Sequence, residues 1–200
     1  MVFQVWIFNS NMATFTMLPD GVTGTNEWTN SGGASHEASC ASDDGASSYI
    51  YEQASANNEI TLTMANPSVA EANIDFDEDV TVTAYMKADY TYVGGGDLGA
   101  PHVYDFLKIQ ITGTDINIAA ASKTLTTEDG SYPLYSGTST TTKSFGNVWD
   151  YDGLENCQVK LENTSRPRRF HPIRVSYVYI EVTYTAIVSA DNATFFGANF

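Results

Sequence analysis

The stretch near the end of the chain, residues 173–184, constrains the fold more than any other part of the sequence. It is rich in β-branched and aromatic residues, it contains no Gly, and Pro172 stands just before it. Apolar and polar residues then alternate: one face carries Val178, Ile180 and Val182, and the other carries Tyr179, Glu181 and Thr183. A strand this long with one apolar face is not stable alone. The pattern therefore predicts a sheet beside it and a second layer beneath it.

Shorter stretches of the same kind recur about every ten to twenty residues along the chain. The strand candidates are residues 49–51, 60–64, 79–88, 107–111, 116–118, one or two strands within 122–143, and 157–161. Residues 112–115 predict a tight hairpin turn, whereas residues 19–21 predict a turn that opens a long loop up to residue 48, in which Trp28 is the one large side chain. No helix is expected. The pattern predicts an all-β, antiparallel jelly roll or β-sandwich.

The two ends of the chain are apolar and aromatic, which is unusual for so acidic a protein. We expect one jelly-roll domain over residues 12–186, an N-terminal arm over 1–11 and a C-terminal arm over 187–200. In such arms, aromatic residues would bind a neighbouring subunit. The candidate interface residues are Val2, Phe3, Trp6, Phe8, Phe195, Phe196 and Phe200. The alternative is that these ends are ordinary strands that close the chain's own sheet.

The charge balance excludes two classes of partner. Lys and Arg number 9 against 24 Asp and Glu, which gives a formal net charge of −15. Phosphate backbones and anionic lipids would repel such a chain, so we expect no nucleic-acid or membrane binding. The sequence holds no apolar run as long as the ~18 residues of a membrane helix, and its first residues lack the basic leader of a signal peptide. Synthesis in the cytoplasm is therefore expected.

The sequence shows no catalytic motif. A nucleophile elbow, a zinc-type Cys/His spacing and a phosphate-binding glycine loop are all missing, and the three His residues are far apart in the chain. We therefore expect no enzyme and no catalytic residue. A small β-sandwich hydrolase or lyase is the rival interpretation, since acids paired only in space leave no trace in sequence. Cys40 and Cys157 either form one disulfide or remain two buried thiols.

Two charged clusters carry further hypotheses. Asp75, Asp77 and Asp79 alternate at the start of a predicted strand, where carboxylates can bind calcium, although a solvated strand end explains them equally. No other cofactor is expected. Arg166, Arg168 and Arg169 are three of only four arginines in the chain. Guanidinium groups pair with carboxylates, so these arginines predict either a contact with an acidic neighbouring subunit or an ion pair within the chain.

Several of these pieces together resemble jelly-roll structural proteins of tailed bacteriophages. The pieces are Trp28-Thr29 in a Gly/Ser-rich segment, Asp43-Asp44 followed by Tyr49-Ile50, the strand from Val80 to Met86, Trp149 with Leu154, and the strand from Arg174 to Val182. The resemblance spans about residues 18 to 184 and rests on spacing and residue type rather than on invariant catalytic residues. It implies a non-enzymatic virion protein, either a capsid decoration (cement) protein or a head or tail fibre module.

From this resemblance and the two apolar ends, we expect a homotrimer that binds the major capsid protein or another virion protein. Its location would be the virion, after synthesis in the host cytoplasm. The alternative is a carbohydrate- or receptor-binding jelly-roll module of a fibre. In that case Trp28, Tyr92 and Trp149 are the candidate platform for a glycan, unless they serve as packing anchors.

Overall fold

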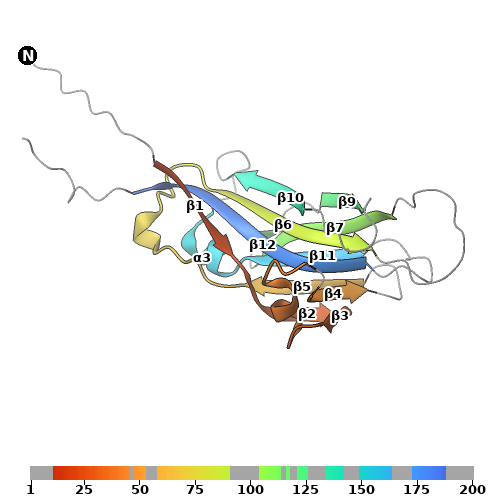
Figure 1. Cartoon of the computed structure of the whole chain (residues 1–200). Helices are drawn as coiled ribbons and strands as arrows, with labels where there is room; N and C mark the ends of the chain where they lie inside the picture. Colours follow the sequence, from red (N-terminus) through yellow and green to blue (C-terminus); the bar gives the residue numbers. More distant parts are fainter. Residues whose placement is uncertain are drawn as a thin grey trace, which may run out of the picture.

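A computed structural model of the chain describes residues 11–45, 47–52, 58–90, 104–113, 116–117, 121–125, 134–141, 149–163 and 173–187. Within them the strands form two antiparallel sheets that pack face to face (Figure 1). This confirms the predicted all-β sandwich. No helix in this part of the chain has the length and apolar character needed to cross a membrane.

The described strands divide equally between the two sheets. Sheet A contains β1 (Asn11–Met17), β3 (Thr29–Ser31), β4 (Tyr49–Glu52), β6 (Thr81–Tyr90), β10 (Leu134–Thr141) and β12 (Ile173–Ala186). Sheet B contains β2 (Pro19–Asn26), β5 (Asn58–Met64), β7 (Tyr104–Gly113), β8 (Ile116–Asn117), β9 (Ala121–Leu125) and β11 (Gln158–Asn163). The short helices are α1 (His36–Cys40), α3 (Tyr151–Glu155) and the 3-10 turn η1 (Glu71–Asn73).

The connectivity is that of a jelly roll. Sheet A runs β10-β6-β12-β4-β3, with β1 also paired to β12, and sheet B runs β2-β5-β11-β7-β8, with β9 also paired to β7. If β4, β5, β6, β7, β9, β10, β11 and β12 are taken as the eight strands of the roll, the first and last are neighbours in one sheet, and the second and seventh are neighbours in the other. Chain segments far apart in sequence therefore meet in both sheets, as in two nested Greek keys.

Strand β12 holds sheet A together. It pairs with β6 over most of its length, with β4 through Ile173–Val175, and with β1 from Ile180 to Ala186. The predicted alternation is confirmed, because Val178, Ile180 and Val182 are fully buried while the residues between them are partly exposed. One residue departs from it: the register shifts between Val175 and Tyr177, so Ser176 is an extra, buried residue in a β-bulge.

The core lies between the inward faces of the two sheets. Its fully buried members include Ile50, Val82, Ala84 and Met86 from sheet A, and Ile60, Leu62, Ile109, Val159 and Leu161 from sheet B. Each buried aliphatic side chain of this size stabilises the fold by roughly 1.5–3 kcal/mol relative to exposure. The strand predictions for β4, β5, β6, β7, β11 and β12, and the hairpin from β7 to β8, are confirmed by these faces and pairings.

The sequence interpretation was wrong between residues 19 and 48. The expected turn at Pro19 is instead the start of β2, which pairs with β5 and absorbs a register shift between Pro19 and Gly21. The expected long loop contains β2, β3 and α1. The expectation of no helix was also wrong: Ser35 caps α1 by accepting a hydrogen bond from the Ala38 N–H, and Asp150 caps α3 in the same way through Gly153. Helices of five residues are too short to show a 3.6-residue period.

The two ends of the described chain lie side by side. Asn11 pairs with Ala186, so β1 already begins at the last residue of the predicted N-terminal arm (Figure 1). Ile187 donates its backbone N–H to the Asn73 carbonyl over 3.0 Å. The other residues of the two predicted arms, 1–10 and 188–200, lie outside the described residues.

Candidate functional site: a tyrosine face on sheet A

None of the predicted interface residues belongs to the described part of the chain. Val2, Phe3, Trp6, Phe8, Arg166, Arg168, Arg169, Phe195, Phe196 and Phe200 all lie outside the described residues, and so does the platform candidate Tyr92. The subunit contacts expected of them stay predictions.

The two other platform candidates are core residues. Trp28 is 4% exposed, and its Nε1 donates to the Asn58 carbonyl over 3.3 Å. Trp149 is 3% exposed and belongs to the same buried cluster as Leu154. A ring with so little exposed surface cannot stack on a ligand, so of the two roles that the sequence left open for Trp28 and Trp149 the structure supports that of packing anchors. Their size makes them packing anchors beneath the loops.

The calcium candidates form a turn ahead of β6. The Asp75 N–H donates to the Thr185 carbonyl over 2.9 Å, and Asp75 Oδ1 accepts from the Asp77 N–H over 3.0 Å. Among the residues that the structure describes, no three His, Cys, Asp or Glu side chains form a group that could hold a metal ion, and this includes Asp75, Asp77 and Asp79.

The two cysteines are separate, buried thiols. Cys40 and Cys157 form no disulfide, so of the two alternatives that the sequence left open the one with two buried thiols is confirmed. Burial raises the pKa of Cys40 to about 12, and it raises the pKa of Cys157 to about 12 as well. Both thiols therefore stay protonated at neutral pH and do not offer a nucleophile.

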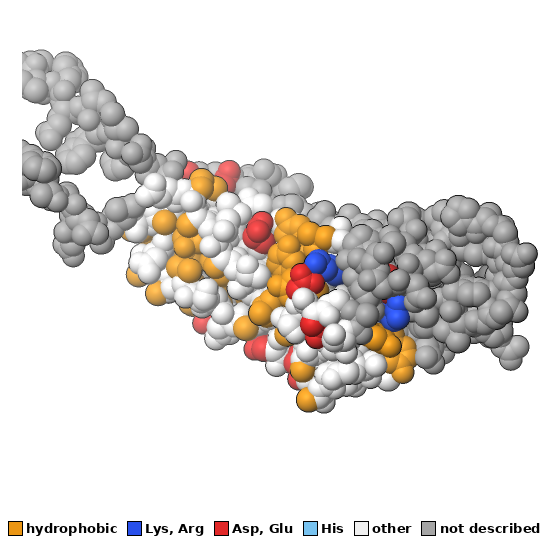
Figure 2. All heavy atoms as spheres, viewed as in Figure 1, with side chains coloured by type: hydrophobic (Ala, Val, Ile, Leu, Met, Phe, Trp, Pro, Cys, Tyr) orange, Lys and Arg blue, Asp and Glu red, His pale blue; other side chains and the backbone are white. Residues whose placement is uncertain are grey.

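The feature that distinguishes the surface is a group of tyrosines on the outer face of sheet A. They are Tyr49 and Tyr51 on β4, Tyr85 on β6, and Tyr177 and Tyr179 on β12, and we call them the tyrosine face. All five are half-buried. Figure 2 views the molecule with this side of sheet A in front, and hydrophobic-type side chains form a band there, beside a few charged side chains.

The rings are in contact rather than scattered. Tyr85 and Tyr179 face each other in register across β6 and β12 and stack with 4.7 Å between centroids and 12° between planes. Tyr177 lies 5.1 Å from Tyr179 along β12. Tyr49 and Tyr51 form an edge-to-face pair at 5.8 Å on β4. Such aromatic pairs hold their rings in fixed positions, so the face is organised before any ligand arrives.

Arg174 links strands β4 and β6 from its place on β12. Its guanidinium lies over the Tyr49 ring, with 5.3 Å from Cζ to the centroid. It also binds Asp89 with two parallel hydrogen bonds, Nε to Oδ1 at 2.9 Å and Nη2 to Oδ2 at 2.8 Å. The Asp89 side chain is fully buried. The bulge at Ser176 makes this arrangement possible, because it allows Arg174 and Tyr177 to point to the same side of β12.

Other charges border the face. Lys87, the register partner of Tyr177, donates to Asp43 Oδ2 over 2.6 Å. Burial raises the pKa of Tyr85 above its usual value, and the negative charge of Glu181 raises it further. Burial also raises the pKa of Tyr179, with smaller contributions from Tyr85 and Glu181. The two phenols therefore keep their protons near neutral pH and remain donors as well as acceptors.

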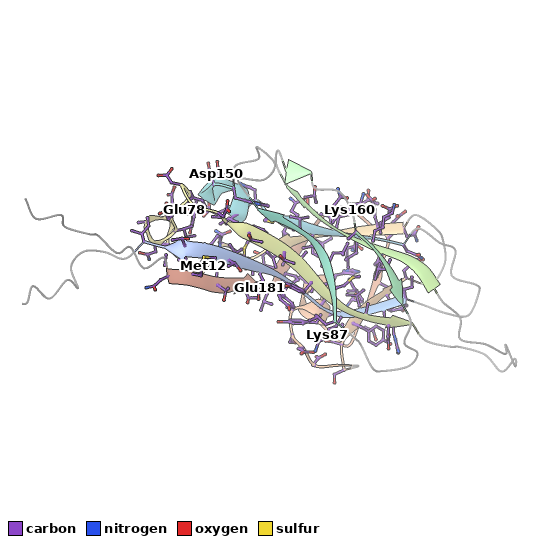
Figure 3. The ribbon with its side chains drawn as sticks, turned by 90° about the horizontal axis from the view of Figure 1, so that it is seen from above. Met12, Glu78, Lys87, Asp150, Lys160 and Glu181 are labelled. Carbon is purple, nitrogen blue, oxygen red and sulfur yellow. The ribbon has the colours of Figure 1, made fainter. Side chains whose placement is uncertain are left out.

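The outer face of sheet B is of a different kind. Lys160 pairs there with Glu59, and Lys108 pairs with Glu162 at 3.5 Å. Figure 3 shows Glu181 and Lys87 along one side of the sandwich and Lys160 on the opposite side. Sheet B thus carries the ion pairs of an ordinary solvated surface. Among the side chains that the structure describes on the two outer faces, the aromatic rings are those of sheet A.

The sequence contains a signal for this site in its Tyr-X-Tyr pairs. Tyr-X-Tyr occurs in the strand candidate at residues 49–51 and again at 177–179, and alternation places both members of each pair on one face. The platform predicted from the sequence, Trp28, Tyr92 and Trp149, contains none of these tyrosines. Only the packing shows that Trp28 and Trp149 are buried and that tyrosines of three strands share one sheet face.

Comparison with known proteins adds no family. No family model matches the chain, and no curated protein matches it. Among solved structures, the chain is similar to one titled "Family 16 Carbohydrate Binding Module-2", with 12% sequence identity over 68% of this chain and 78% of that chain, and a TM-score of 0.31. This likeness is too distant to assign a family or a ligand.

Proposed function

We propose that this protein is a non-enzymatic binding module that holds a neutral carbohydrate on its tyrosine face. The observation that carries the proposal is the set of five tyrosines on one face of β4, β6 and β12, with ring contacts within the β4 pair and among Tyr85, Tyr177 and Tyr179. The jelly-roll sandwich serves as the rigid support for this array. No enzymatic step is part of the proposal.

The chemistry of tyrosine suits a sugar. A sugar ring has apolar C–H patches and a rim of hydroxyl groups, and a phenol offers an apolar ring together with a hydroxyl that donates and accepts. Binding sites for such ligands combine aromatic side chains with a few well-placed polar groups. Here Glu181, Asp43 and Lys87 supply polar groups at the border of the face.

The charges favour a neutral ligand. The two cations of the site, Arg174 and Lys87, are each bound to an aspartate, and Glu181 adds a further negative charge. The chain as a whole carries −15. An acidic polysaccharide or a nucleic acid would need a positively charged surface, which this face does not offer. This holds for a nucleic acid even though nucleic-acid bases also stack on aromatic rings.

Affinity electrophoresis in gels that contain soluble neutral polysaccharides, namely glucomannan, xyloglucan, xylan or amylose, tests the proposal. We expect retardation in at least one of these gels and none with alginate, an acidic polymer. Tyr179→Ala should weaken the binding about tenfold, a loss of ~1.4 kcal/mol, which is comparable to the cost of removing an aromatic residue that stacks on a nucleic-acid base. Lys160→Ala, on the outer face of sheet B, is the matched control and should bind normally.

Two results would refute the proposal. One is the absence of retardation in every neutral gel. The other is a Tyr179→Ala protein that is folded by circular dichroism and still binds as tightly as the wild-type chain.

A virion structural role is the second candidate, and the position of the two ends of the described part of the chain supports it. Asn11 and Ala186 are paired at one end of β12, whereas Arg174 and the β4 tyrosines lie toward its other end. A module attached through both ends would therefore display the tyrosine face away from its attachment. In this proposal the chain is a homotrimer that binds the major capsid protein or belongs to a fibre.

Mass spectrometry of purified phage particles, with the copy number counted relative to the major capsid protein, tests the second candidate. A high copy number supports capsid decoration, and a low one supports a fibre. Absence of the chain from the particles would rule out both. Light scattering of the pure protein would show whether it is a trimer.

A further inference from the structure

The outer face of sheet A continues past the tyrosines as rows of hydroxyl side chains. Strand pairing places Thr14, Thr183 and Thr81 side by side on β1, β12 and β6. The next row toward Tyr179 contains Thr16, Glu181 and Thr83. We call these residues the threonine rows.

The threonine rows lie on the same face as the tyrosines. Residues two apart in a strand point to the same side, so Thr183 and Glu181 follow Tyr179 on β12, and Thr81 and Thr83 follow Tyr85 on β6. Thr14 and Thr16 are exposed, and the other members of the rows are half-buried. In Figure 3, Glu181 lies between Met12 and Lys87 along this side of the sandwich.

Threonine is a common strand residue, so its presence alone is not informative. The outer face of sheet B also carries Thr61, Thr63 and Thr112, but there charged residues stand beside them: Glu59, Glu162, Lys108 and Lys160 occupy neighbouring positions on its strands. In the threonine rows Glu181 is the one charged residue, and the others carry hydroxyls. The tyrosines and the rows together form a continuous surface of rings and hydroxyls.

This surface is long. Six residue steps separate Tyr177 from Thr183 along β12, which at ~3.3 Å per residue is roughly 20 Å. That length exceeds a single sugar and matches several linked sugars. A terminal sugar would instead use one compact pocket.

We propose that the protein recognises the interior of an extended neutral polysaccharide, whose chain lies along β12 from the tyrosine face onto the threonine rows. This inference rests on the function proposed above and specifies its ligand class. The tyrosines supply stacking surfaces for some sugar units, and the threonine hydroxyls exchange hydrogen bonds with the hydroxyls of further units.

Isothermal titration calorimetry with manno-oligosaccharides and cello-oligosaccharides, from the disaccharide to the octasaccharide, tests the inference. For the series that binds, we expect affinity to rise with length up to at least the hexasaccharide. The double variant Thr14→Val, Thr183→Val keeps two β-branched side chains and removes two hydroxyls. It should weaken hexasaccharide binding about fivefold, the equivalent of one net hydrogen bond, and leave disaccharide binding unchanged.

Thr61→Val, at a half-buried position on β5 in sheet B, is the matched control and should bind both lengths normally. Two results would refute the extended ligand but leave the tyrosine face as the proposed binding site. One is a disaccharide that binds as tightly as the octasaccharide. The other is a Thr14→Val, Thr183→Val protein that binds every length normally while Tyr179→Ala does not. If neither oligosaccharide series binds, or if Tyr179→Ala has no effect on binding, the proposed function fails and this inference fails with it.

Discussion

Arg174 is the single side chain on which the geometry of the tyrosine face depends most. It joins a ring of β4 to a carboxylate of β6 from its place on β12 between them. Its partner Asp89 is fully buried, and a buried carboxylate is costly unless it is paired. Sheet A therefore needs this ion pair, because Arg174 compensates the buried charge of Asp89.

Arg174→Met should destabilise the protein by about 3–5 kcal/mol, because it leaves the Asp89 carboxylate buried without its guanidinium partner. Urea unfolding followed by tyrosine and tryptophan fluorescence measures the change. The double variant Asp89→Asn, Arg174→Met should recover part of the loss, since the buried charge is gone. A loss below ~1 kcal/mol in the single variant would show that this pair contributes no more than a surface ion pair.

The bulge in β12 accommodates one extra residue without reversing a face of the strand. If Ser176 were paired without a bulge, alternation from Val178 back along the strand would turn Arg174 toward the core. Ser176 itself contributes little through its side chain: its Oγ is buried and has no hydrogen-bond partner among the described residues. The bulge therefore keeps Arg174 on the outer face, and the Ser176 hydroxyl has no part in this.

Two variants separate these roles. Ser176→Ala should leave the free energy of unfolding within ~0.5 kcal/mol of the wild type or raise it, because it removes a buried polar group that gains nothing. Deletion of Ser176 should keep the fold and the Arg174–Asp89 pair, because Val175 and Tyr177 then become consecutive residues that pair with Ala88 and Lys87 in regular register, each on its present face. Circular dichroism and urea unfolding measure both. A deletion variant that does not fold would contradict the view that the bulge merely accommodates one extra residue.

At the scale of the whole molecule, the buried ionisable groups make the free energy of unfolding decrease at alkaline pH. The pKa of each buried thiol is raised from 9.0 to about 12, and the pKa values of Tyr85 and Tyr179 are raised as well. The unfolded chain therefore loses these protons at a lower pH than the folded one. Stability from these groups is complete below pH ~9 and is lost as pH rises toward the folded pKa values.

We expect the free energy of unfolding to be unaffected by these groups between pH ~6 and ~8.5 and to fall between pH ~9 and ~11. Cys157→Ala should reduce the slope of this fall, since one of the thiols no longer titrates. Urea unfolding at a series of pH values, with a reducing agent present, measures it. An equal slope in the wild type and in Cys157→Ala would show that this thiol does not contribute.

The sequence by itself determined the strands and their inward faces. A period of two is a local property of the chain, so the buried residues of β5, β6, β7, β11 and β12 could be predicted without knowledge of their neighbours. Local signals also misled: Pro19 suggested a turn where the chain forms β2, and Trp28 suggested a platform where it fills the core. Burial of a large side chain depends on what packs over it, which no local pattern contains.

Only the tertiary structure decided which strands are neighbours, and with that where the candidate site lies. Tyr49, Tyr85 and Tyr179 come from three distant parts of the chain and share one face because jelly-roll pairing places β12 between β4 and β6. Strand pairing is a choice among non-local contacts, each favoured by the shared core and opposed by the entropy of closing a long loop. The alternation of residues along a strand determines which face of the sheet a side chain lies on, whereas the pairing of strands determines which side chains are its neighbours.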